Sequence, residues 1–419
     1  MRVLITGAGI SGLAAARALL AAGHDVTVLE RSPGLRDGGY AVVLWPNGTA
    51  ILRGLGTDTA GAEHPLTGVA VRSSSGRPAM TVSTGGLEAA YGAPTIAITR
   101  RDLVTRLADG VPEDRIRFGA RAVRVTDGDG EVRVATEDGR EFTGDLLIGA
   151  DGVNSAVRAH VAGSEAKARA RPTGAATWQG LIPAPFHLDD RFTMYMGREG
   201  SIGMTPVADG RVLWLIDLDQ PAGEGHDDPA RALPLLRRSY ARWAPEVRGL
   251  LDALTEDDLA LFPHRRHYPP LHWWKGRCVL IGDAAHAMPP ILAQGVSQAM
   301  EDVAALANAL ADATGAAGPS GEPDLGAALA AYERARNKQA VKAGDGATGS
   351  IATSGPRTLL QTDTMMRLAR LIPRRAPTAM FERIVAGVAH APGGPKAYAL
   401  GAPEAIADSE GTESGTAAR

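Results

Sequence analysis

The feature that most constrains the fold is a glycine-rich turn near the start of the chain. Gly7, Gly9 and Gly12 have the GxGxxG spacing, between a short apolar run (residues 3–5) and a segment rich in alanine and leucine (residues 13–22). In such a strand–turn–helix unit the first glycine allows the tight turn, the second lets the backbone approach a pyrophosphate, and the third lets the helix pack closely against the sheet. The turn therefore predicts a dinucleotide-binding unit with phosphates at the helix N-terminus.

An acidic residue indicates which dinucleotide this unit binds. Residues 25–29 have the pattern of a second strand and end on Glu30, about 20 residues after the glycines, as the mechanism requires. A carboxylate suits the two hydroxyl groups of an adenosine ribose and would repel a 2′-phosphate. The adenosine therefore belongs to FAD or NAD rather than NADP, and the adjacent Arg31 is a further cofactor-binding candidate.

A second set of glycines has the same spacing in a different context. Gly344, Gly346 and Gly349 follow a polar helical segment, and no strand precedes them. The bare pattern is a weak signal, so we interpret this match as a loop.

Composition limits the class of protein. A chain of 419 residues suggests about two or three domains. The net charge is −3 and no basic tract is present, which argues against nucleic acid as a partner. The single cysteine, Cys278, lies in an apolar run and is predicted to be a buried strand residue. Arg17 interrupts the N-terminal apolar stretch, which argues against a signal peptide. No uncharged run approaches the ~20 residues needed to span a bilayer, so we expect a soluble, cytoplasmic protein.

The pattern of apolar, polar and turn residues changes along the chain. Residues 116–142 alternate as strands do and contain two hairpin signals, Asp-Gly-Asp-Gly at 127–130 and Asp-Gly at 138–139. Residues 173–272 indicate an antiparallel sheet with one helix at 229–243. Further helices are expected at the segments listed here: 295–311, 325–343 and 356–373.

Two later motifs decide between FAD and NAD. LLIGADGVNSAVR (residues 146–158) contains Asp151 and Gly152, and CVLIGDAAHAMPPILAQGVSQAMEDV (residues 278–303) contains Gly282 and Asp283. With these motifs the chain resembles the p-hydroxybenzoate-hydroxylase-type, single-component (group A) FAD-dependent aromatic monooxygenases. That family has an N-terminal GxGxxG with its acid, a central "DG" motif and a later "GD" motif, and all three occur here in order. The resemblance covers roughly residues 1–345.

The resemblance implies an α/β fold with a Rossmann-like FAD-binding domain of the GR2 type. We expect this domain to be discontinuous (1–172 and 273–343), with the substrate-binding β-sheet (173–272) inserted into it. A C-terminal helical segment (344–400) and a disordered tail (401–419) would follow.

The resemblance also implies roles for single residues. Glu30 would bind the adenosine ribose, and Arg36 would lie near the flavin phosphates or the path of the nicotinamide. Arg100 would touch FAD, with its neighbour Arg101 as the alternative. The DG motif would contact both FAD and the nicotinamide coenzyme. The aspartate of the GD motif would bind ribitol or pyrophosphate oxygens.

Plainer interpretations remain open for several of these residues. Asp151 is also a good candidate to cap the next helical turn. Arg36 and Arg100 could each be a solvated surface charge. His286, in the GD motif, is interpreted as a structural residue that bonds the nearby backbone rather than as a catalytic base.

The segment after the GD motif predicts a contact with the flavin ring. Pro290 and the glycine-containing turn before the helix that starts near Gly295 would place a helix N-terminus at the negatively charged edge of reduced flavin. Gly295 and Val296 would then offer backbone N–H groups. The family usually has glycine where this chain has Ala293, which narrows the backbone conformations available to the loop.

The family resemblance implies a reaction but not a substrate. Non-covalent FAD would take a hydride from NADH or NADPH, react with O₂ to give a C4a-hydroperoxyflavin, and oxygenate an aromatic or polycyclic, natural-product-like molecule. No second strand–GxGxxG–helix unit is present, so the nicotinamide coenzyme would visit rather than occupy a domain. The alternatives are an epoxidase, a Baeyer–Villiger enzyme, a non-oxygenating flavin oxidoreductase, or a flavin-binding protein without turnover.

No catalytic residue is assigned with the same support. Tyr195 and His267 are weak candidates to bind a phenol oxygen and assist its deprotonation. No metal constellation is expected, and the chain could be a monomer or a homodimer. The large apolar residues of the predicted sheet, which are more often core than ligand contacts, are Trp178, Met194, Met196, Met204 and Trp214.

Overall fold

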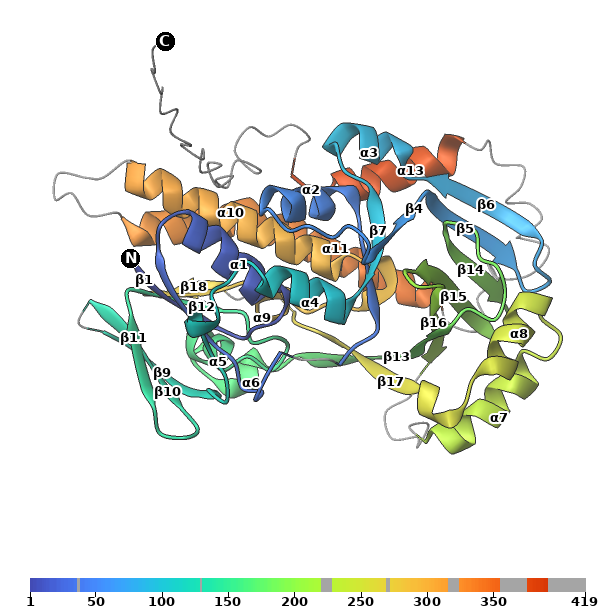
Figure 1. Ribbon diagram of the computed structural model, residues 1–419, viewed down its shortest axis with the longest axis horizontal. Helices are drawn as coiled ribbons and strands as arrows, with labels where there is room; N and C mark the ends of the chain where they lie inside the picture. Colours follow the sequence, from blue (N-terminus) through green and yellow to red (C-terminus); the bar gives the residue numbers. More distant parts are fainter. Residues whose placement is uncertain are drawn as a thin grey trace, which may run out of the picture.

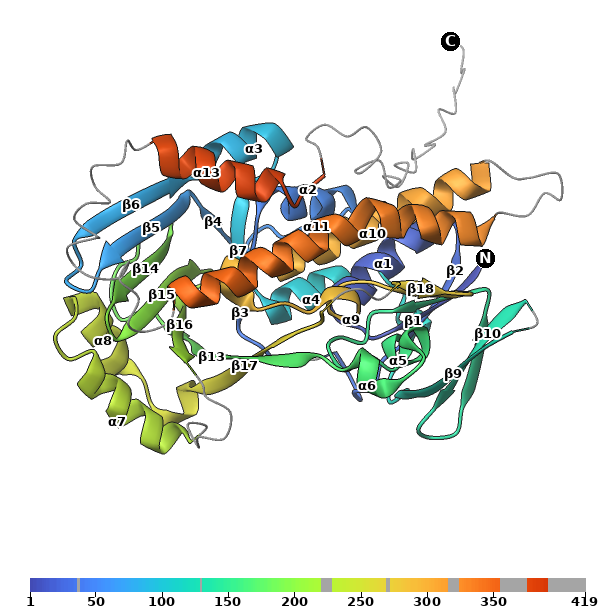
Figure 2. The same cartoon turned by 180° about the vertical axis from the view of Figure 1, so that it is seen from behind.

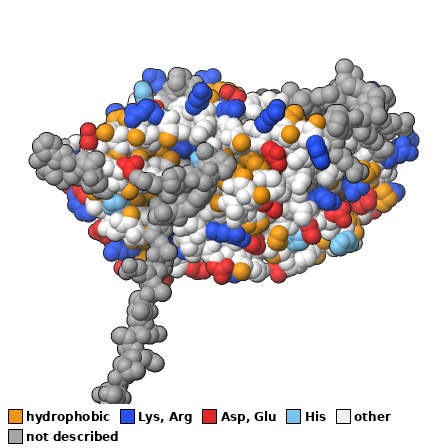
Figure 3. Space-filling model, turned by 90° about the horizontal axis from the view of Figure 1, so that it is seen from above, with side chains coloured by type: hydrophobic (Ala, Val, Ile, Leu, Met, Phe, Trp, Pro, Cys, Tyr) orange, Lys and Arg blue, Asp and Glu red, His pale blue; other side chains and the backbone are white. Residues whose placement is uncertain are grey.

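The structure is a computed structural model of the chain. It describes residues 1–35, 38–128, 130–219, 228–268, 272–315, 324–354 and 375–390. Two sheets lie toward opposite ends of the long axis, and two long helices, α10 (Gly295–Gly315) and α11 (Leu325–Ser354), run along one side between them (Figures 1 and 2). On the face seen from above, basic and acidic side chains are interspersed (Figure 3).

A mostly parallel sheet forms the first layer, with the strand order β18-β19-β12-β1-β2-β8. Its strands are β1 (Arg2–Thr6), β2 (Asp25–Leu29), β8 (Ile116–Arg117), β12 (Leu146–Gly149), β18 (Trp274–Lys275) and β19 (Cys278–Leu280). Strands β19, β12, β1 and β2 pair in parallel, and their short apolar runs are almost fully buried, as expected for a sheet covered on both faces. This arrangement confirms the predicted Rossmann-like unit and the buried position of Cys278.

Helix α1 (Ile10–Ala21) contacts β1 and β2 of this sheet. Helix α10 contacts α1, α2 and α11. The described helices not yet given are α2 (Pro46–Gly54), α3 (Gly85–Tyr91), α4 (Arg100–Ala108), α5 (Ala156–Ala162), α6 (Glu165–Ala168), α7 (Pro229–Ser239), α8 (Pro245–Ala253), α9 (Asp283–His286) and α13 (Arg375–Ala386), with short 3₁₀ turns η1 (Glu113–Arg115), η2 (Glu256–Asp258) and η3 (Pro290–Leu292). No helix within the described residues combines the length and apolarity needed to cross a bilayer.

Two small antiparallel sheets accompany the parallel one. The first is made of β9 (Ala122–Gly128), β10 (Glu131–Thr136) and β11 (Glu141–Gly144), and it contains both predicted hairpins. The second has the order β3-β7-β4 and is made of β3 (Ala41–Leu44), β7 (Thr95–Thr99) and β4 (Glu63–Leu66).

A larger, mostly antiparallel sheet lies at the other end of the molecule, with the order β17-β13-β16-β15-β14-β5-β6. Its strands are β5 (Gly68–Ser73), β6 (Pro78–Ser83), β13 (Arg171–Pro183), β14 (Phe192–Gly197), β15 (Gly200–Val207), β16 (Arg211–Asp219) and β17 (Ala260–Arg266). Strands β5 and β6 belong to this sheet although they lie outside residues 173–272. Strand β5 joins the sheet by pairing in parallel with β14. The proposed domain limits remain a prediction.

The two faces of this sheet contact different parts of the molecule. Adjacent residues of a strand point to opposite faces. Trp214 packs with Trp178 and Tyr195 against α7 and α8, whereas its neighbour Leu213 packs with Val207 against residues of β3 and β7. The second face is therefore the one turned toward the rest of the chain, and we call it the inner face.

Three predictions of secondary structure need correction. The helix expected at 229–243 ends at Ser239, and a second helix, α8, begins only at Pro245, which disfavours a helical conformation of Ala244 before it. The helix expected at 325–343 continues to Ser354. It includes Gly344, Gly346 and Gly349, so our interpretation of these glycines as a loop was wrong. A side chain at Gly344 would lie 3.3 Å from Nη2 of Arg266, so tertiary packing accounts for one glycine inside this helix. The helix expected at 356–373 and the tail at 401–419 lie outside the described residues.

Candidate functional site

The three motifs meet at one edge of the parallel sheet. They follow the carboxyl ends of β1, β2, β12 and β19, which are neighbours in the sheet, and such an edge is where ligands bind in open α/β folds. The Gly7 N–H donates to Leu29 O at 2.7 Å, and the Ala150 N–H donates to Thr6 O at 3.0 Å. The structure thus brings together segments that are up to about 280 residues apart.

The glycines of the first motif divide into packed and open positions. Gly7 has φ +96°, and a Cβ there would lie 2.6 Å from Ala150 O. A Cβ at Gly12 would lie 1.9 Å from Gly7 O. A Cβ at Gly9 would meet nothing within 4 Å, and Gly9 is the N-cap of α1 with no side-chain cap. The first N–H groups of α1 are therefore available for an anion beside Gly9.

Glu30, directly after β2, stabilises this turn. It is 6% exposed, and its Oε2 accepts from the Ala8 N–H at 2.7 Å while Oε1 accepts from the Ser32 N–H at 2.9 Å. Each carboxylate oxygen has a second lone pair that can accept from a ribose hydroxyl. Arg31 is exposed beside it, and Arg36 lies outside the described residues.

Arg100 begins α4 and is exposed. Its backbone N–H donates to Tyr40 O at 2.9 Å, and a Cβ at Gly39 would lie 2.6 Å from its Cδ. The aliphatic stem of Arg100 therefore covers the glycine of the loop before β3. Arg101 is also exposed, so the choice between the two arginines stays a prediction.

The DG motif contains an acid with one satisfied and one unsatisfied oxygen. Oδ2 of Asp151 accepts from the Ala156 N–H, at the first residue of α5, at 2.8 Å, which supports the capping interpretation. Oδ1 is buried and has no hydrogen-bond partner among the described residues. Burial raises the pKa of Asp151. Gly152 has φ +79°, and a Cβ there would meet nothing within 4 Å.

Arg158, a residue to which sequence analysis gave no role, joins the DG and GD segments. It is 2% exposed and donates to Ala168 O, Ala284 O and Ala285 O at 2.7–3.1 Å. Burial lowers its pKa to about 10. An arginine one turn into the helix after a DG motif, inside an apolar stretch, is the sequence signal that could have indicated a buried cation.

His267 lies next to Arg158 and lines a small cavity together with His286 and Tyr268. Burial lowers the pKa of His267 to about 3, and the charge of Arg158 contributes. Its imidazole interacts with backbone groups of Val153 and Asp283, which belong to the DG and GD motifs. The role in phenol binding stays a prediction.

Tyr195 lies far from these loops, in the apolar cluster between the large sheet and helices α7 and α8. Burial raises its pKa to about 12. The structure does not bring Tyr195 and His267 together. Tyr195 lies on the face of the sheet opposite the inner face, and this position argues against the predicted role in deprotonating a phenol.

The GD motif is held from behind by α10. Gly282 has φ +56°, and a Cβ there would lie 2.3 Å from Oγ of Ser11, in the first turn of α1. Its N–H donates to Oδ2 of Asp302 at 2.8 Å. Asp283 is exposed at the start of α9. His286 is buried, and its Nε2 lies 2.6 Å from the same carboxylate oxygen, so its side chain contacts α10 rather than the nearby backbone that we expected.

The loop that follows leads into the N-terminus of α10. Pro290 is exposed at the start of η3, and Ala293 has φ +49° and ψ 31°, the left-handed conformation that glycine adopts most easily. A Cβ at Gly295 would meet nothing within 4 Å. Gly295 and Val296 are in the first turn of α10, where backbone N–H groups have no partner within the helix.

The inner face of the large sheet supplies an apolar and a polar region. The apolar region packs Val207 and Leu213 with Trp45 and Ala293. The Trp45 Nε1–H donates to Leu292 O at 3.1 Å, which ties this region to the loop before α10. Phe381 of α13 meets the Trp45 ring edge-on at 4.9 Å between centroids.

The polar region of the inner face is a buried hydrogen-bonded cluster. Thr177 and Ser201 each donate to Asp217 at 2.9 Å, and Nε2 of His264 lies 2.7 Å from the Thr177 hydroxyl. Burial raises the pKa of Asp217 and lowers that of His264 to about 4. Asp217 is four residues after Leu213 in β16, so both lie on the inner face.

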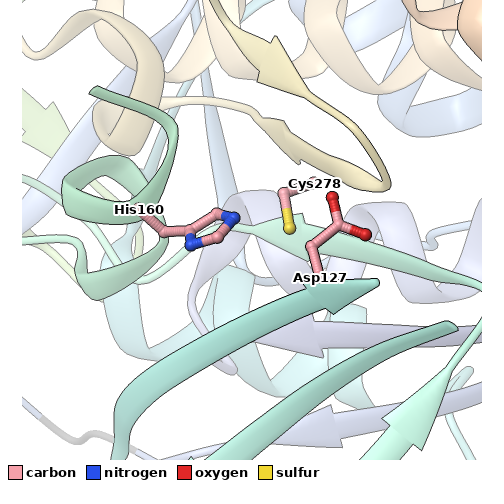
Figure 4. Close-up of side chains that lie close together, drawn as sticks. All are labelled: Asp127, His160 and Cys278. Carbon is pink, nitrogen blue, oxygen red and sulfur yellow. The ribbon is translucent and has the colours of Figure 1, made fainter. Parts of the chain in front are cut away.

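A separate cluster lies at the beginning of β19, away from the edge where the motifs meet. One ligand-type atom each of Asp127, His160 and Cys278 lies within 4.8 Å of the others (Figure 4). The carboxylate already accepts from the Arg277 N–H at 2.9 Å, and burial raises the pKa of the thiol to about 12. These contacts are those of a partly buried polar cluster, in which only Cys278 is fully buried.

The residues at the sheet edge fit FAD. Three backbone positions, at Gly9, Gly152 and Gly295, face space that a Cβ would enter without contact, and they come from all three motifs. The unpaired buried oxygen of Asp151 lies at the same edge. The first turns of α1 and α10 have backbone N–H groups without partners in the helix, which suit anionic groups such as phosphates.

Comparison with known proteins shows the family. A family model described as "FAD binding domain" matches residues 1–346. An aurachin C monooxygenase/isomerase from Stigmatella aurantiaca is 33% identical, over 81% of this chain and 86% of that protein. A FAD-dependent urate hydroxylase from Klebsiella pneumoniae is 33% identical, over 80% and 86%. The structure of Klebsiella pneumoniae HpxO with FAD and uric acid superposes with a TM-score of 0.82 at 29% identity, covering 92% of this chain and 96% of the other.

These similarities, together with the geometry of the sheet edge, define a flavoprotein of the group A type. The chain belongs to the family of FAD-dependent aromatic hydroxylases that carries this FAD-binding domain. It is an FAD-dependent monooxygenase, which confirms the resemblance found in the three motifs.

Proposed function

We propose that the protein uses NADH or NADPH and O₂ to insert one oxygen atom into an aromatic or polycyclic small molecule that carries hydroxyl or N–H groups. FAD, when bound, supplies the acceptor for the hydride and the activation of O₂. The single observation that carries the proposal is the inner face of the large sheet, whose apolar region contacts the loop that leads into α10.

Different residues of the chain would bind different parts of FAD. Gly9 and Glu30 would hold the adenosine half of FAD, and Asp283 would hold its central part. Gly295 and Val296 would place backbone N–H groups at the flavin edge that becomes negatively charged on reduction. Asp151 would interact with the oxygen groups of FAD or with the visiting coenzyme.

The inner face would bind the substrate in two parts. Val207, Leu213 and Trp45 are packed together and buried, and they would form the apolar wall behind a substrate ring and keep water from the reacting centre. The cluster around Asp217 lies further along the same face and offers acceptors for hydroxyl or N–H donors of the substrate. A molecule with an aromatic ring and at least one such donor matches both parts.

The test is an ¹⁸O₂ labelling assay with the purified protein, FAD and NADPH or NADH, across phenols, polyketide aromatics, alkenes and cyclic ketones. The proposal expects one ¹⁸O atom in a ring hydroxyl group, found by mass spectrometry, and bleaching of the flavin by the coenzyme. Label in an epoxide or a lactone would favour the alternative oxygenations. Bleaching without label in any product would favour a non-oxygenating flavin oxidoreductase, and failure to bleach would favour a flavin-binding protein without turnover.

A further inference from the structure

A fully buried carboxylate on α10 lies behind the GD motif. Asp302 is 0% exposed and accepts from the Gly282 N–H at 2.8 Å and from Nε of Arg336 at 2.8 Å, while Nε2 of His286 lies 2.6 Å from it. Burial alone would raise the pKa of Asp302, but the charges and hydrogen bonds of His286 and Arg336 lower it, so the group is a carboxylate.

Arg336 fixes this carboxylate from α11. It is 2% exposed and also donates to Oε1 of Gln298 at 2.7 Å and to Oε1 of Gln339 at 2.8 Å. The Asp302 side chain is therefore held by contacts with α9, α11 and the loop at Gly282, and its orientation is set by packing and charge together. A buried ion pair of this kind is weak evidence for stability, because apolar residues of similar volume often stabilise a fold equally well.

The position of Asp302 in the chain connects two proposed FAD contacts. Its carboxylate holds both ends of the α9 turn, at Gly282 and at His286, and Asp283 lies between them. Asp302 itself is on α10, which begins seven residues earlier at Gly295. Seven residues span about 10 Å along the helix axis. The α10 helix therefore carries one contact at its own N-terminus and holds the segment that carries the other.

We propose that Asp302, clamped by Arg336, is a positioning residue that sets the distance between the GD motif and the N-terminus of α10, and so determines the affinity for FAD. The proposal rests on the contacts assigned above to Asp283 and Gly295 and does not depend on the substrate. A residue that acts in this way affects ligands that span both contacts. It leaves the adenosine-binding turn at Gly9 and Glu30 unchanged.

The experiment compares two charge-neutral pairs of substitutions in the full chain. Asp302→Leu with Arg336→Met removes the acceptor for the Gly282 N–H and leaves no unpaired buried charge. Asp302→Asn with Arg336→Gln also removes both charges but keeps an amide oxygen for that N–H. The apoproteins are titrated with FAD, read by quenching of flavin fluorescence, and with ADP as a competitor, and their unfolding midpoints are measured.

We expect the Leu/Met pair to bind FAD about 10-fold or more weakly, because a buried donor has lost its partner, while the ADP affinity stays within about 3-fold of the parent. The Asn/Gln pair should stay within about 3-fold for both ligands. Glu301→Gln is the matched control: this neighbour on α10 contacts Asn47 and His390 instead of the GD motif, and FAD binding should not change.

His286→Leu provides an independent variant that leaves the Asp302–Arg336 pair intact, and it decides the matter if the Leu/Met pair does not fold. It should weaken FAD binding about 3- to 10-fold without weakening ADP binding. The proposal is overturned by a folded Leu/Met pair or a His286→Leu variant with parental FAD affinity. A parallel loss of FAD and ADP affinity would also overturn it, because that would indicate a general structural effect. An equal loss of FAD affinity in both pairs would overturn it too, because the Asn/Gln pair keeps an acceptor for the Gly282 N–H.

Discussion

At the scale of single residues, Ala293 has a backbone conformation that is unusual for a residue with a side chain. It has φ +49°, where an L-residue with a Cβ is disfavoured. We predict that Ala293→Gly raises the free energy of unfolding by up to about 1 kcal/mol, since glycine relieves this cost. The measurement is urea denaturation of the two proteins. Ala331→Gly, inside α11, is the control and should lower stability by about 1 kcal/mol; a similar loss at Ala293 would contradict the left-handed assignment.

Gly9 and Gly349 allow a matched test of what a GxGxxG glycine does. A Cβ at either position meets no atom within 4 Å. Gly9→Ala should leave stability nearly unchanged but weaken FAD binding by about 10-fold or more, because the methyl group would occupy the space for the pyrophosphate. Gly349→Ala, in a helix, should stabilise the protein by about 0.5–1 kcal/mol and leave FAD binding unchanged. Equal FAD affinities, read by fluorescence titration, would remove the phosphate role of Gly9.

Sequence could identify the motif residues but not the residues behind them. The motif residues belong to short local patterns, whose residue types and spacing alone indicate the chemistry. These residues are Gly7, Glu30, Asp151 and Gly282. The pair Asp302–Arg336 joins residues 34 positions apart, and only folding shows that both are buried together.

At the scale of elements, the large sheet carries a pH-sensitive cluster. Burial lowers the pKa of His264 from 6.5 to about 4, so the native state binds its proton later than the unfolded state as the pH falls. The contribution of neutral His264 to the free energy of unfolding is fully present above pH 6.5. It is lost as the pH falls from 6.5 to about 4, by roughly 3 kcal/mol in total. At pH 7.5 we expect His264→Asn to be less stable than the parent, because its bond to Thr177 is lost.

The stability difference between His264→Asn and the parent should narrow as the pH is lowered toward 4. Urea denaturation at half-unit steps of pH measures both free energies of unfolding. A difference that stays constant across this range would show that His264 titrates normally in the native state.

Elements were predictable where their signal is local. The strands of the parallel sheet and the hairpins at 127–130 and 138–139 follow from short patterns and turn residues. The pairing of β5 with β14 could not be read, because it depends on contacts over more than 100 residues. Helix α11 continues through three glycines because tertiary packing outweighs their low helix propensity.

At the scale of the whole molecule, the site is assembled from both ends of the described chain. The turn after β1 and the GD motif after β19 are in contact through Gly282 and Ser11. The inner face of the large sheet reaches the same region through Trp45, and α13 adds Phe381 to it. FAD binding is therefore a property of the complete fold, and each part of the cofactor would contact a different segment.

The most direct measurement is a titration of the apoprotein with FAD and, in parallel, with FMN, which lacks the adenosine half. The account predicts saturation at one FAD per chain, release of unmodified FAD on denaturation, and FMN binding that is weaker by about 100-fold or more, because the segment from Gly7 to Glu30 would have nothing to hold. A protein that stays colourless with FAD, or that binds FMN as tightly as FAD, would contradict the convergence of the three motifs on one dinucleotide.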